Sequence, residues 1–139
     1  MTRPDGVLLD TSAWIAFFSP TGHSLLKSEV RGALQEERVH TCPVVTCELL
    51  IGVRDRKAFA KLADLLAALP AAPIDRETWG RAADLGFSLR RKGHSIPLPD
   101  LLIVEACRDA SLTLWHLDLH LEIAARHTRI QARSFLKSA

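Results

Sequence analysis

The sequence has no long apolar stretch, no block of like charges and only three cysteines. A helix needs about 20 consecutive apolar residues to cross a bilayer, so the first absence excludes a membrane span. The second excludes the charged, disordered tails that runs of about five or more like charges form. Cys42, Cys47 and Cys107 form no C-x-x-C pair, so we expect buried structural thiols and no zinc or redox motif. Residues 1–5 carry an acid and a proline ahead of a short apolar stretch, which is unlike a secretion signal, and we expect a cytoplasmic protein.

The composition is that of a globular domain. Of the 139 residues, 47% are hydrophobic and 24% are charged, and 18 Lys and Arg against 16 Asp and Glu leave a net charge of +2. A chain of this length can bury most of the surface that it exposes when unfolded. Because no repeat, low-complexity segment or linker is visible, we expect one domain over residues 1–139. The small net charge does not indicate a polyanionic partner, so any such binding must come from local arrangement.

Short apolar runs alternate with segments of helical periodicity. We expect strands at 7–9, 39–41 and 112–117, with weaker candidates at 72–75 and 130–135. We expect helices around 14–18 and at 24–37, 43–53, 55–69, 77–92, 100–110 and 119–127, the fifth of them capped by Gly93. Strands separated by helices predict an α/β fold, in which a parallel sheet has helices on both faces.

Two acids end predicted strands. Asp10 closes the run 7–9, and Asp118 closes the run 112–117. Open α/β sheets place their sites at this carboxyl edge. Each acid also stands where the N-cap of the next helix falls, so the residues alone leave a cap and a site both open. Two further acids are unusual. We expect the others where acids usually lie, on solvated helix ends and mixed-charge helices, with Glu105 beside Arg108.

The two further acids lie on apolar helix faces. Glu48 shares its face with Val44 and Ile51, so its carboxylate is predicted to point toward the core. The alternative is a pair with one basic side chain, because a lone buried charge costs several kcal/mol. Asp100 shares its face with Ile103 and its neighbours, and taken singly it could be a helix cap.

Taken together, the four acids predict a metal site. Carboxylates about 5 Å apart repel by about 3 kcal/mol per pair at an effective dielectric constant near 20, so a cluster needs compensation. Mg²⁺ or Mn²⁺ supplies it, since these hard cations take carboxylate oxygens. Outside this cluster the chain has twelve acids and eighteen bases, which predicts a basic surface around an acidic pocket.

Four motifs carry a resemblance to a known family. They are LLDTSAWI at 8–15, CELLIG at 47–52, PDLLI at 99–103 and LDLHL at 117–121. In this order they resemble the PIN-domain family and, more narrowly, the VapC-like toxins of bacterial type II toxin-antitoxin pairs. The resemblance implies a three-layer α/β/α domain with a central, mostly parallel sheet. It also implies an endoribonuclease that depends on Mg²⁺, with Mn²⁺ as a substitute.

The resemblance assigns roles residue by residue. The catalytic and metal-binding quartet matches Asp10, Glu48, Asp100 and Asp118, and Ser12 matches the hydroxyl residue that supports the first acid. Metal-activated water would then attack a phosphodiester in structured RNA, such as a tRNA or rRNA loop, and leave a 5′-phosphate and a 3′-hydroxyl.

The chain departs from the family pattern at two positions. His116 stands where Thr or Ser is frequent, and Leu121 stands where Phe is common. His116 is open to a role in substrate or proton handling, or to packing at the end of a strand.

The resemblance also implies partners. Besides RNA, these are a small antitoxin protein and a second copy of the chain, with no membrane involved. Arg54 and Arg91, each in a local basic group, are candidate substrate-binding residues, although Arg91 could instead interact with a helix dipole. With no tyrosine and three tryptophans, the sequence nominates no residue for base stacking. The apolar segment with Trp14, Phe17 and Phe18 is a candidate for the contact between copies, and burial in the core explains it equally well.

Two other functions compete with the ribonuclease. A PIN-like module could bind RNA or protein without cutting, if His116 and its surroundings displace Asp118. A phosphotransfer enzyme or receiver domain is disfavoured, because Leu8 and Leu9 precede Asp10 where such sites have acids, and no Lys ends a later strand.

Overall fold

The computed structural model describes residues 5–136. Within that range the chain forms seven helices and one sheet of four strands. The strands are β1 (Val7–Leu9), β2 (Val39–His40), β3 (Thr113–His116) and β4 (Ala132–Ser134). They pair in parallel in the order β2-β1-β3-β4. The predicted α/β fold with a parallel sheet is therefore confirmed. Residues 1–4, which carried part of the expectation about a secretion signal, lie outside the described residues.

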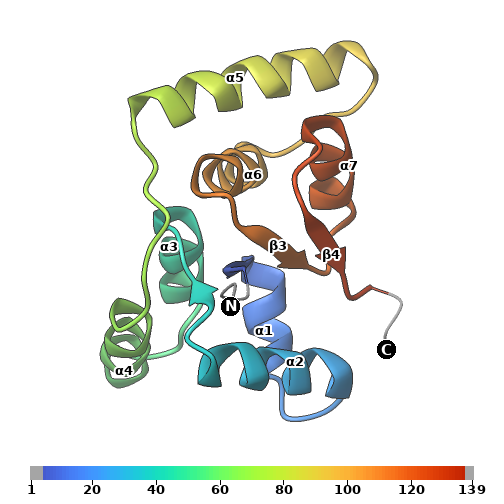
Figure 1. Ribbon diagram of the computed structural model, residues 1–139. Coiled ribbons are helices and arrows are strands. Elements are labelled where there is room, and N and C mark those ends of the chain that lie inside the picture. The colour runs from blue at the N-terminus through green and yellow to red at the C-terminus, as the bar shows by residue number, and fades with distance from the viewer. Residues whose placement is uncertain (1–4, 137–139) are drawn as a thin grey trace.

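Helices lie on both sides of this sheet. They are α1 (Thr11–Phe18), α2 (Ser24–Gln35), α3 (Pro43–Ile51), α4 (Arg56–Ala67), α5 (Arg76–Arg91), α6 (Leu98–Ala110) and α7 (Leu119–Thr128). Figure 1 shows α1 and α2 on one side of β3 and β4, with α5, α6 and α7 on the other, which completes three layers. Across residues 5–136, no helix is long and apolar enough to cross a membrane.

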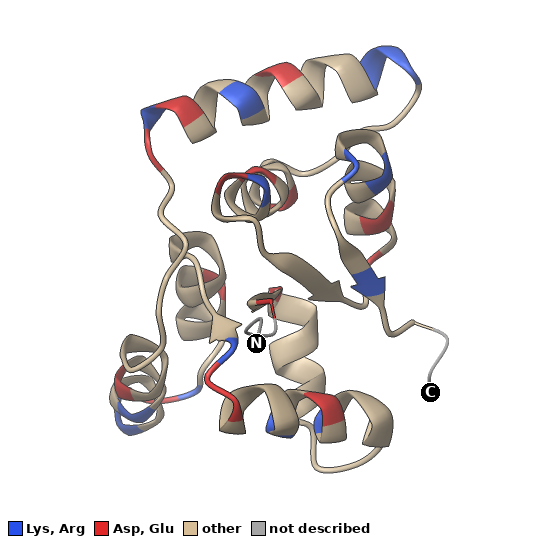
Figure 2. Ribbon diagram, in the orientation of Figure 1, with Lys and Arg blue, Asp and Glu red and all other residues tan. Residues whose placement is uncertain are grey.

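A network of charges joins α5 to α6, two helices on which Figure 2 shows both acidic and basic residues. Glu105 is 1% exposed, and its Oε1 accepts from Nε of Arg81 at 3.3 Å and lies 3.6 Å from Nη1 of Arg108. Arg81 also binds Asp109, which accepts a further bond from Thr78. The expected place of Glu105 beside Arg108 is confirmed, but the expectation of an ordinary surface acid is wrong, because α5 covers this face of α6.

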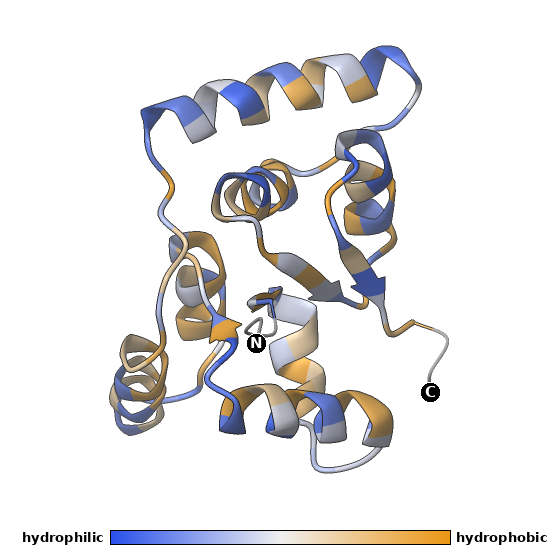
Figure 3. Ribbon diagram, viewed as in Figure 1, coloured by the Kyte–Doolittle hydropathy of each residue, from blue (hydrophilic) through white to orange (hydrophobic). Residues whose placement is uncertain are grey.

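The core lies between the layers. All three residues of β1 are at most 1% exposed, as expected of a parallel strand with both faces covered. Trp14 from α1 and Leu114 from β3 are completely buried beside it. Figure 3 shows hydrophilic and hydrophobic residues alternating along α5, which is typical of a helix with one packed face.

The candidate strand at 72–75 does not form. The chain makes only an isolated bridge between Thr41 and Ala71 and then runs on to Asp75, the N-cap of α5. Pro73 lacks the N–H that a further ladder bond would need. By contrast, the weaker candidate at 130–135 contains β4, and Gly93 follows α5 with φ at +92°, as its predicted capping role requires.

Candidate active site

Two acids meet at the carboxyl ends of neighbouring strands. Leu9 pairs with Trp115, so the residues that follow β1 and β3 share one edge of the sheet. Asp10 caps α1 by accepting the N–H of Ala13 at 2.9 Å. Asp118 caps α7 by accepting the N–H groups of His120 at 2.7 Å and of Leu121 at 3.2 Å. The cap and the site are therefore compatible roles for these two side chains.

Ser12 links the two strand ends. Its Oγ lies 2.8 and 2.7 Å from the two carboxylate oxygens of Asp10, to which it donates. The same Oγ accepts the backbone N–H of Leu117 at 3.0 Å. One hydroxyl thus ties the Asp10 carboxylate to the residue that precedes Asp118, which is geometry suited to a supporting residue.

Asp100 enters from the first turn of α6. The helix begins at Leu98, earlier than predicted, because Pro97 and Pro99 are tolerated where no helical N–H bond is due. Pro97 is the N-cap and makes no side-chain cap bond, so the interpretation of Asp100 as a cap is wrong. Its side chain is 16% exposed and is free to face the strand ends.

The acids perturb one another. Burial raises the pKa of Asp10 to about 6, against the bonds from Ser12 and Ala13, and the charge of Asp118 raises it further. Burial also raises the pKa of Asp100 to about 7, with added repulsion from Asp118, Asp10 and Glu48 and an opposing effect of His120. All four predicted acids therefore lie within electrostatic reach of one another.

Glu48 reaches this group from α3, but its setting differs from the prediction. The side chain is half-buried, and Ile51, expected on the same core-facing surface, is 83% exposed. Thr11 donates its hydroxyl to Oε1 of Glu48 at 2.6 Å. Among residues 5–136 Glu48 forms no ion pair, so the expected alternative of a basic partner is not found either.

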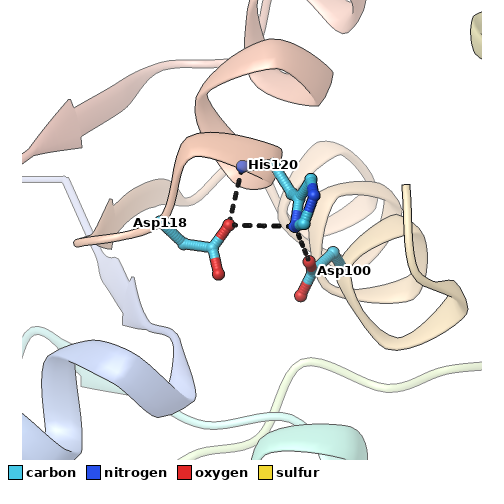
Figure 4. A group of neighbouring side chains, drawn as sticks. All are labelled: Asp100, Asp118 and His120. Carbon is cyan, nitrogen blue, oxygen red and sulfur yellow. Dashed lines mark hydrogen bonds and ion pairs between the residues drawn. The ribbon is translucent and has the colours of Figure 1, made fainter. Parts of the chain in front are cut away.

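His120 belongs to the group and was missed in the sequence. Its Nδ1 lies 3.9 Å from Oδ2 of Asp100 and 3.8 Å from Oδ1 of Asp118. Figure 4 shows the imidazole between the two carboxylates. The only signal in the sequence is its place two residues after Asp118, which puts it on the same first turn of α7.

His116 is packed at the strand end. It is 1% exposed, and its Nδ1 accepts the backbone N–H of Asp118 at 3.1 Å. Burial lowers the pKa of this imidazole, which favours the neutral form that can accept this bond. Leu121, the other departure from the family pattern, is completely buried. Asp118 is therefore not displaced by His116, which instead fixes its backbone.

The predicted substrate-binding arginines stand apart from the acids. Arg54 is exposed in the loop between α3 and α4, and Arg91 is exposed in the last turn of α5, with its guanidinium 5.6 Å from the ring centre of Phe87. Within residues 5–136, no hydrogen bond or ion pair joins either of them to the acidic group.

Two of the three tryptophans and two of the three cysteines are buried, and the third of each is exposed. Trp14 and Trp115 are buried, which leaves Trp79, 51% exposed, as a surface aromatic. Cys42 and Cys107 are buried as expected. The expectation for Cys47 is wrong, because it lies on the exposed side of α3.

An open apolar cleft adjoins the acidic group. It has a volume of about 510 Å³ and lies between α1, α3 and α4. The residues that line it are Ile15, Phe18, Ser19, Glu48, Leu49, Gly52, Val53 and Leu62. Phe18 is 46% and Ile15 60% exposed, whereas Trp14 of the same helix is fully buried. Glu48 thus belongs both to this cleft and to the acidic group.

The donor set suits a divalent cation. Ligand atoms of Asp100, Asp118 and His120 all lie within 4.8 Å of one another, and Asp10 faces the same edge. Carboxylates whose pKa values are raised by mutual repulsion are stabilised by a bound positive charge. Fold and site together define a class of protein, the parallel α/β domain with an acidic, metal-compatible site at its strand ends.

Comparison with known proteins narrows this class. Residues 7–126 match the model of the PIN domain, and the chain belongs to the PIN-domain family. It is similar to ribonuclease VapC11 of Mycobacterium tuberculosis, with 34% identity over 133 residues, 93% of this chain and 98% of the relative.

Solved structures share the fold. FitAcB from Neisseria gonorrhoeae has a TM-score of 0.74 at 18% identity, over 94% of this chain and 99% of that one. VapBC-5, from the toxin-antitoxin systems of Mycobacterium tuberculosis, has a TM-score of 0.66 at 20% identity, over 94% and 99%. These structures confirm the three-layer fold, and the 34% identity to ribonuclease VapC11 confirms the resemblance to VapC-like toxins.

Proposed function

We propose that this protein is a metal-dependent endoribonuclease that acts as the toxin of a toxin-antitoxin pair. The observation that carries the proposal is the meeting of Asp10, Glu48, Asp100 and Asp118 at one edge of the sheet, with pKa values of about 6 and about 7 for Asp10 and Asp100. Such a concentration of carboxylates is suited to a cation that then meets a phosphate. The similarity to proteins named VapC ribonucleases, at 34% identity, supports the choice of RNA.

The side chains would divide the work. Asp10, Asp100 and Asp118 would hold Mg²⁺ or Mn²⁺, and a bound ion of this kind lowers the pKa of water and neutralises charge on a phosphate. Ser12 keeps the Asp10 carboxylate in place through its two contacts of 2.8 and 2.7 Å. Glu48, oriented by Thr11, completes the set as a ligand or by orienting the attacking water. In-line attack would leave a 5′-phosphate and a 3′-hydroxyl.

RNA would approach over a basic surround. Exposed Arg54 and Arg91 are our candidates for contacts with backbone phosphates outside the reacting one. An accessible loop or single strand of a structured RNA is the expected substrate, because its phosphates can reach a site at the edge of a sheet.

The test compares purified wild-type protein with Asp10→Asn on structured RNA, each with Mn²⁺, Mg²⁺ or EDTA. Because Asn also caps helices well, Asp10→Asn is expected to keep the fold and its circular dichroism while cleavage falls at least about a hundredfold. Mapping of RNA 5′ ends after induced expression of both forms then identifies the target. Equal cleavage by both forms, or none in any metal, would overturn the proposal, and RNA binding without cleavage would favour the non-cleaving module.

An antitoxin would cover the apolar cleft. The structural relative VapBC-5 is named as a member of the VapBC family of toxin-antitoxin systems. The cleft between α1, α3 and α4 exposes Phe18 and Ile15 next to Glu48, so an apolar segment bound there would lie at the active site. Phe18→Asp should weaken capture of a small co-purifying protein at least tenfold, about 1.4 kcal/mol.

The matched control is Phe87→Asp, because Phe87 is also exposed, at 63%, but lies on α5 away from the cleft. Equal loss of the partner in both variants would show that the cleft is not its site.

We also propose a homodimer, for which light scattering of the purified chain should give twice the 15.4 kDa mass.

A further inference from the structure

The acidic site of this chain contains a nitrogen donor as well as carboxylate oxygens. His120 Nδ1 is 3.9 Å from Oδ2 of Asp100 and 3.8 Å from Oδ1 of Asp118, and the three ligand atoms form one group within 4.8 Å. In Figure 4 the ring stands beside both carboxylates although half of the side chain is exposed.

These spacings are close to those of ligands that share one ion. With bonds of about 2.1 Å, ligand atoms around an octahedral ion lie about 3.0 Å apart when adjacent and about 4.2 Å apart when opposite. The two spacings of Nδ1, 3.9 and 3.8 Å, fall inside that range. Only a small side-chain adjustment would therefore bring all three onto a common ion.

The backbone holds His120 in this position. Its N–H donates to Oδ1 of Asp118 at 2.7 Å, so the first turn of α7 fixes its Cα beside that carboxylate. His116 also lies close to Asp118, but it is 1% exposed and its Nδ1 is occupied by a backbone N–H. Of these two imidazoles, His120 is therefore the one that is open to an ion.

We propose that His120 is a metal ligand and that it makes this site prefer Mn²⁺ over Mg²⁺. The inference rests on the proposed function and deepens it. Mg²⁺ is a hard ion that takes oxygen ligands and keeps several waters. An imidazole nitrogen adds affinity for transition-metal ions, and Mn²⁺ combines that property with a preference for carboxylates. A mixed set of carboxylates and one imidazole thus separates two ions that carboxylates alone bind alike.

Calorimetric titration of the full chain with each ion tests the preference. His120→Ala should raise the Kd for Mn²⁺ about 10- to 100-fold, because loss of a direct ligand should cost at least as much as loss of a residue that only supports a ligand. The Kd for Mg²⁺ should change less than about threefold. The control is His127→Ala, because His127 is an exposed histidine of the same helix whose Nδ1 lies 2.9 Å from the carbonyl of Ile123. Both Kd values should stay unchanged in the control.

A charge effect would give the opposite result. If His120 served only as an internal counter-ion to Asp100 and Asp118, its removal would tighten the binding of both ions. Tighter or equal binding of Mn²⁺ in His120→Ala would therefore overturn the proposal. In His120→Asp, which offers an oxygen donor at the same place, the preference for Mn²⁺ should be lost, because the set is again all oxygen.

Spectroscopy gives a second readout that does not depend on cleavage. Electron spin-echo spectra of Mn²⁺ bound to the wild type should show ¹⁴N modulation from the imidazole, and the modulation should vanish in His120→Ala but persist in His127→Ala. Bound Mn²⁺ without ¹⁴N modulation would refute ligation by His120 and leave the proposed nuclease intact. Failure of the wild type to bind either ion would instead refute the metal-dependent function itself.

Discussion

Asp10 and Asp118 each have two tasks, and the first task serves the second. As N-caps they accept backbone N–H groups, Ala13 in one case and both His120 and Leu121 in the other. These bonds restrict the carboxylates to one orientation before any ligand arrives. A site that is already oriented loses less conformational entropy on binding. The helix starts thus preorganise the acids at the sheet edge.

The burial of Asp10 has a cost that depends on pH. Its pKa is about 6 in the folded chain, against a reference value of 3.8, mainly because burial disfavours the carboxylate. At pH values between 3.8 and about 6, the Asp10 carboxyl therefore keeps its proton in the folded state and loses it in the unfolded state. Asp10 contributes stability that is full below about pH 4 and is lost as the pH rises through about 6.

We therefore predict a pH-dependent difference between wild type and Asp10→Asn in EDTA. Wild type should lose about 2.5 kcal/mol of unfolding free energy relative to the variant between pH 4 and pH 7.5, since one pKa unit corresponds to about 1.4 kcal/mol and the unfolded state is already partly ionised at pH 4. Urea denaturation at several pH values measures it. The comparison cancels the contribution of His116, whose lowered pKa acts in the opposite direction. If the difference in unfolding free energy did not change with pH, burial would not raise the pKa of Asp10 in the folded state.

At the scale of elements, α5 is attached to α6 through ionic contacts as well as apolar packing. Arg81 is the centre, because it contacts both the buried Glu105 and the exposed Asp109. The α6 helix that it holds also carries Asp100 into the site. Removal of one partner of a buried pair is costly because it leaves the other charge without compensation.

Arg81→Met should therefore lower the unfolding free energy by clearly more than a control substitution, because it leaves the buried Glu105 with only Arg108, at 3.6 Å. Urea denaturation checks the value, with Arg90→Met as the control, because Arg90 is exposed in the last turn of α5 and should change stability by less than about 0.5 kcal/mol. Adding Glu105→Gln to Arg81→Met should recover part of the loss, because the buried charge that lost its main partner is gone. No recovery in the double variant would point to lost packing instead.

The sequence predicts elements that depend on local pattern and misses contacts that depend on packing. The strand 7–9 and the acid that follows it are visible because a short apolar run ends at a capping residue. Asp118 was predicted for the same reason. Glu105 was not recognised as buried, because its surroundings depend on how α5 crosses α6. His120 was missed because its proximity to Asp100 requires α6 and α7 to meet, and no spacing in the sequence encodes that meeting.

At the scale of the whole molecule, the net charge of +2 conceals an uneven distribution. Four of the sixteen acids are gathered at one site, so twelve acids are set against eighteen bases over the rest of the chain. Figure 2 shows basic residues on helices and a strand on several sides of the molecule. Under the proposed function, a polyanion would be attracted by the surround while the reacting phosphate met only the acidic site.

Salt dependence tests this distribution with the Asp10→Asn protein, which is expected not to cleave, and a labelled single-stranded RNA. Each phosphate contact should add about 0.7 to the slope of log affinity against log salt concentration. If Arg54 and Arg91 each contact one phosphate, changing either to Ala should reduce the slope by about that amount, whereas Arg31→Ala, an exposed change on α2, should leave it as it is. Fluorescence anisotropy at several KCl concentrations measures the slopes. Equal slopes in all four proteins would remove both arginines from the RNA path, and the basic contacts would then have to come from other faces of the molecule.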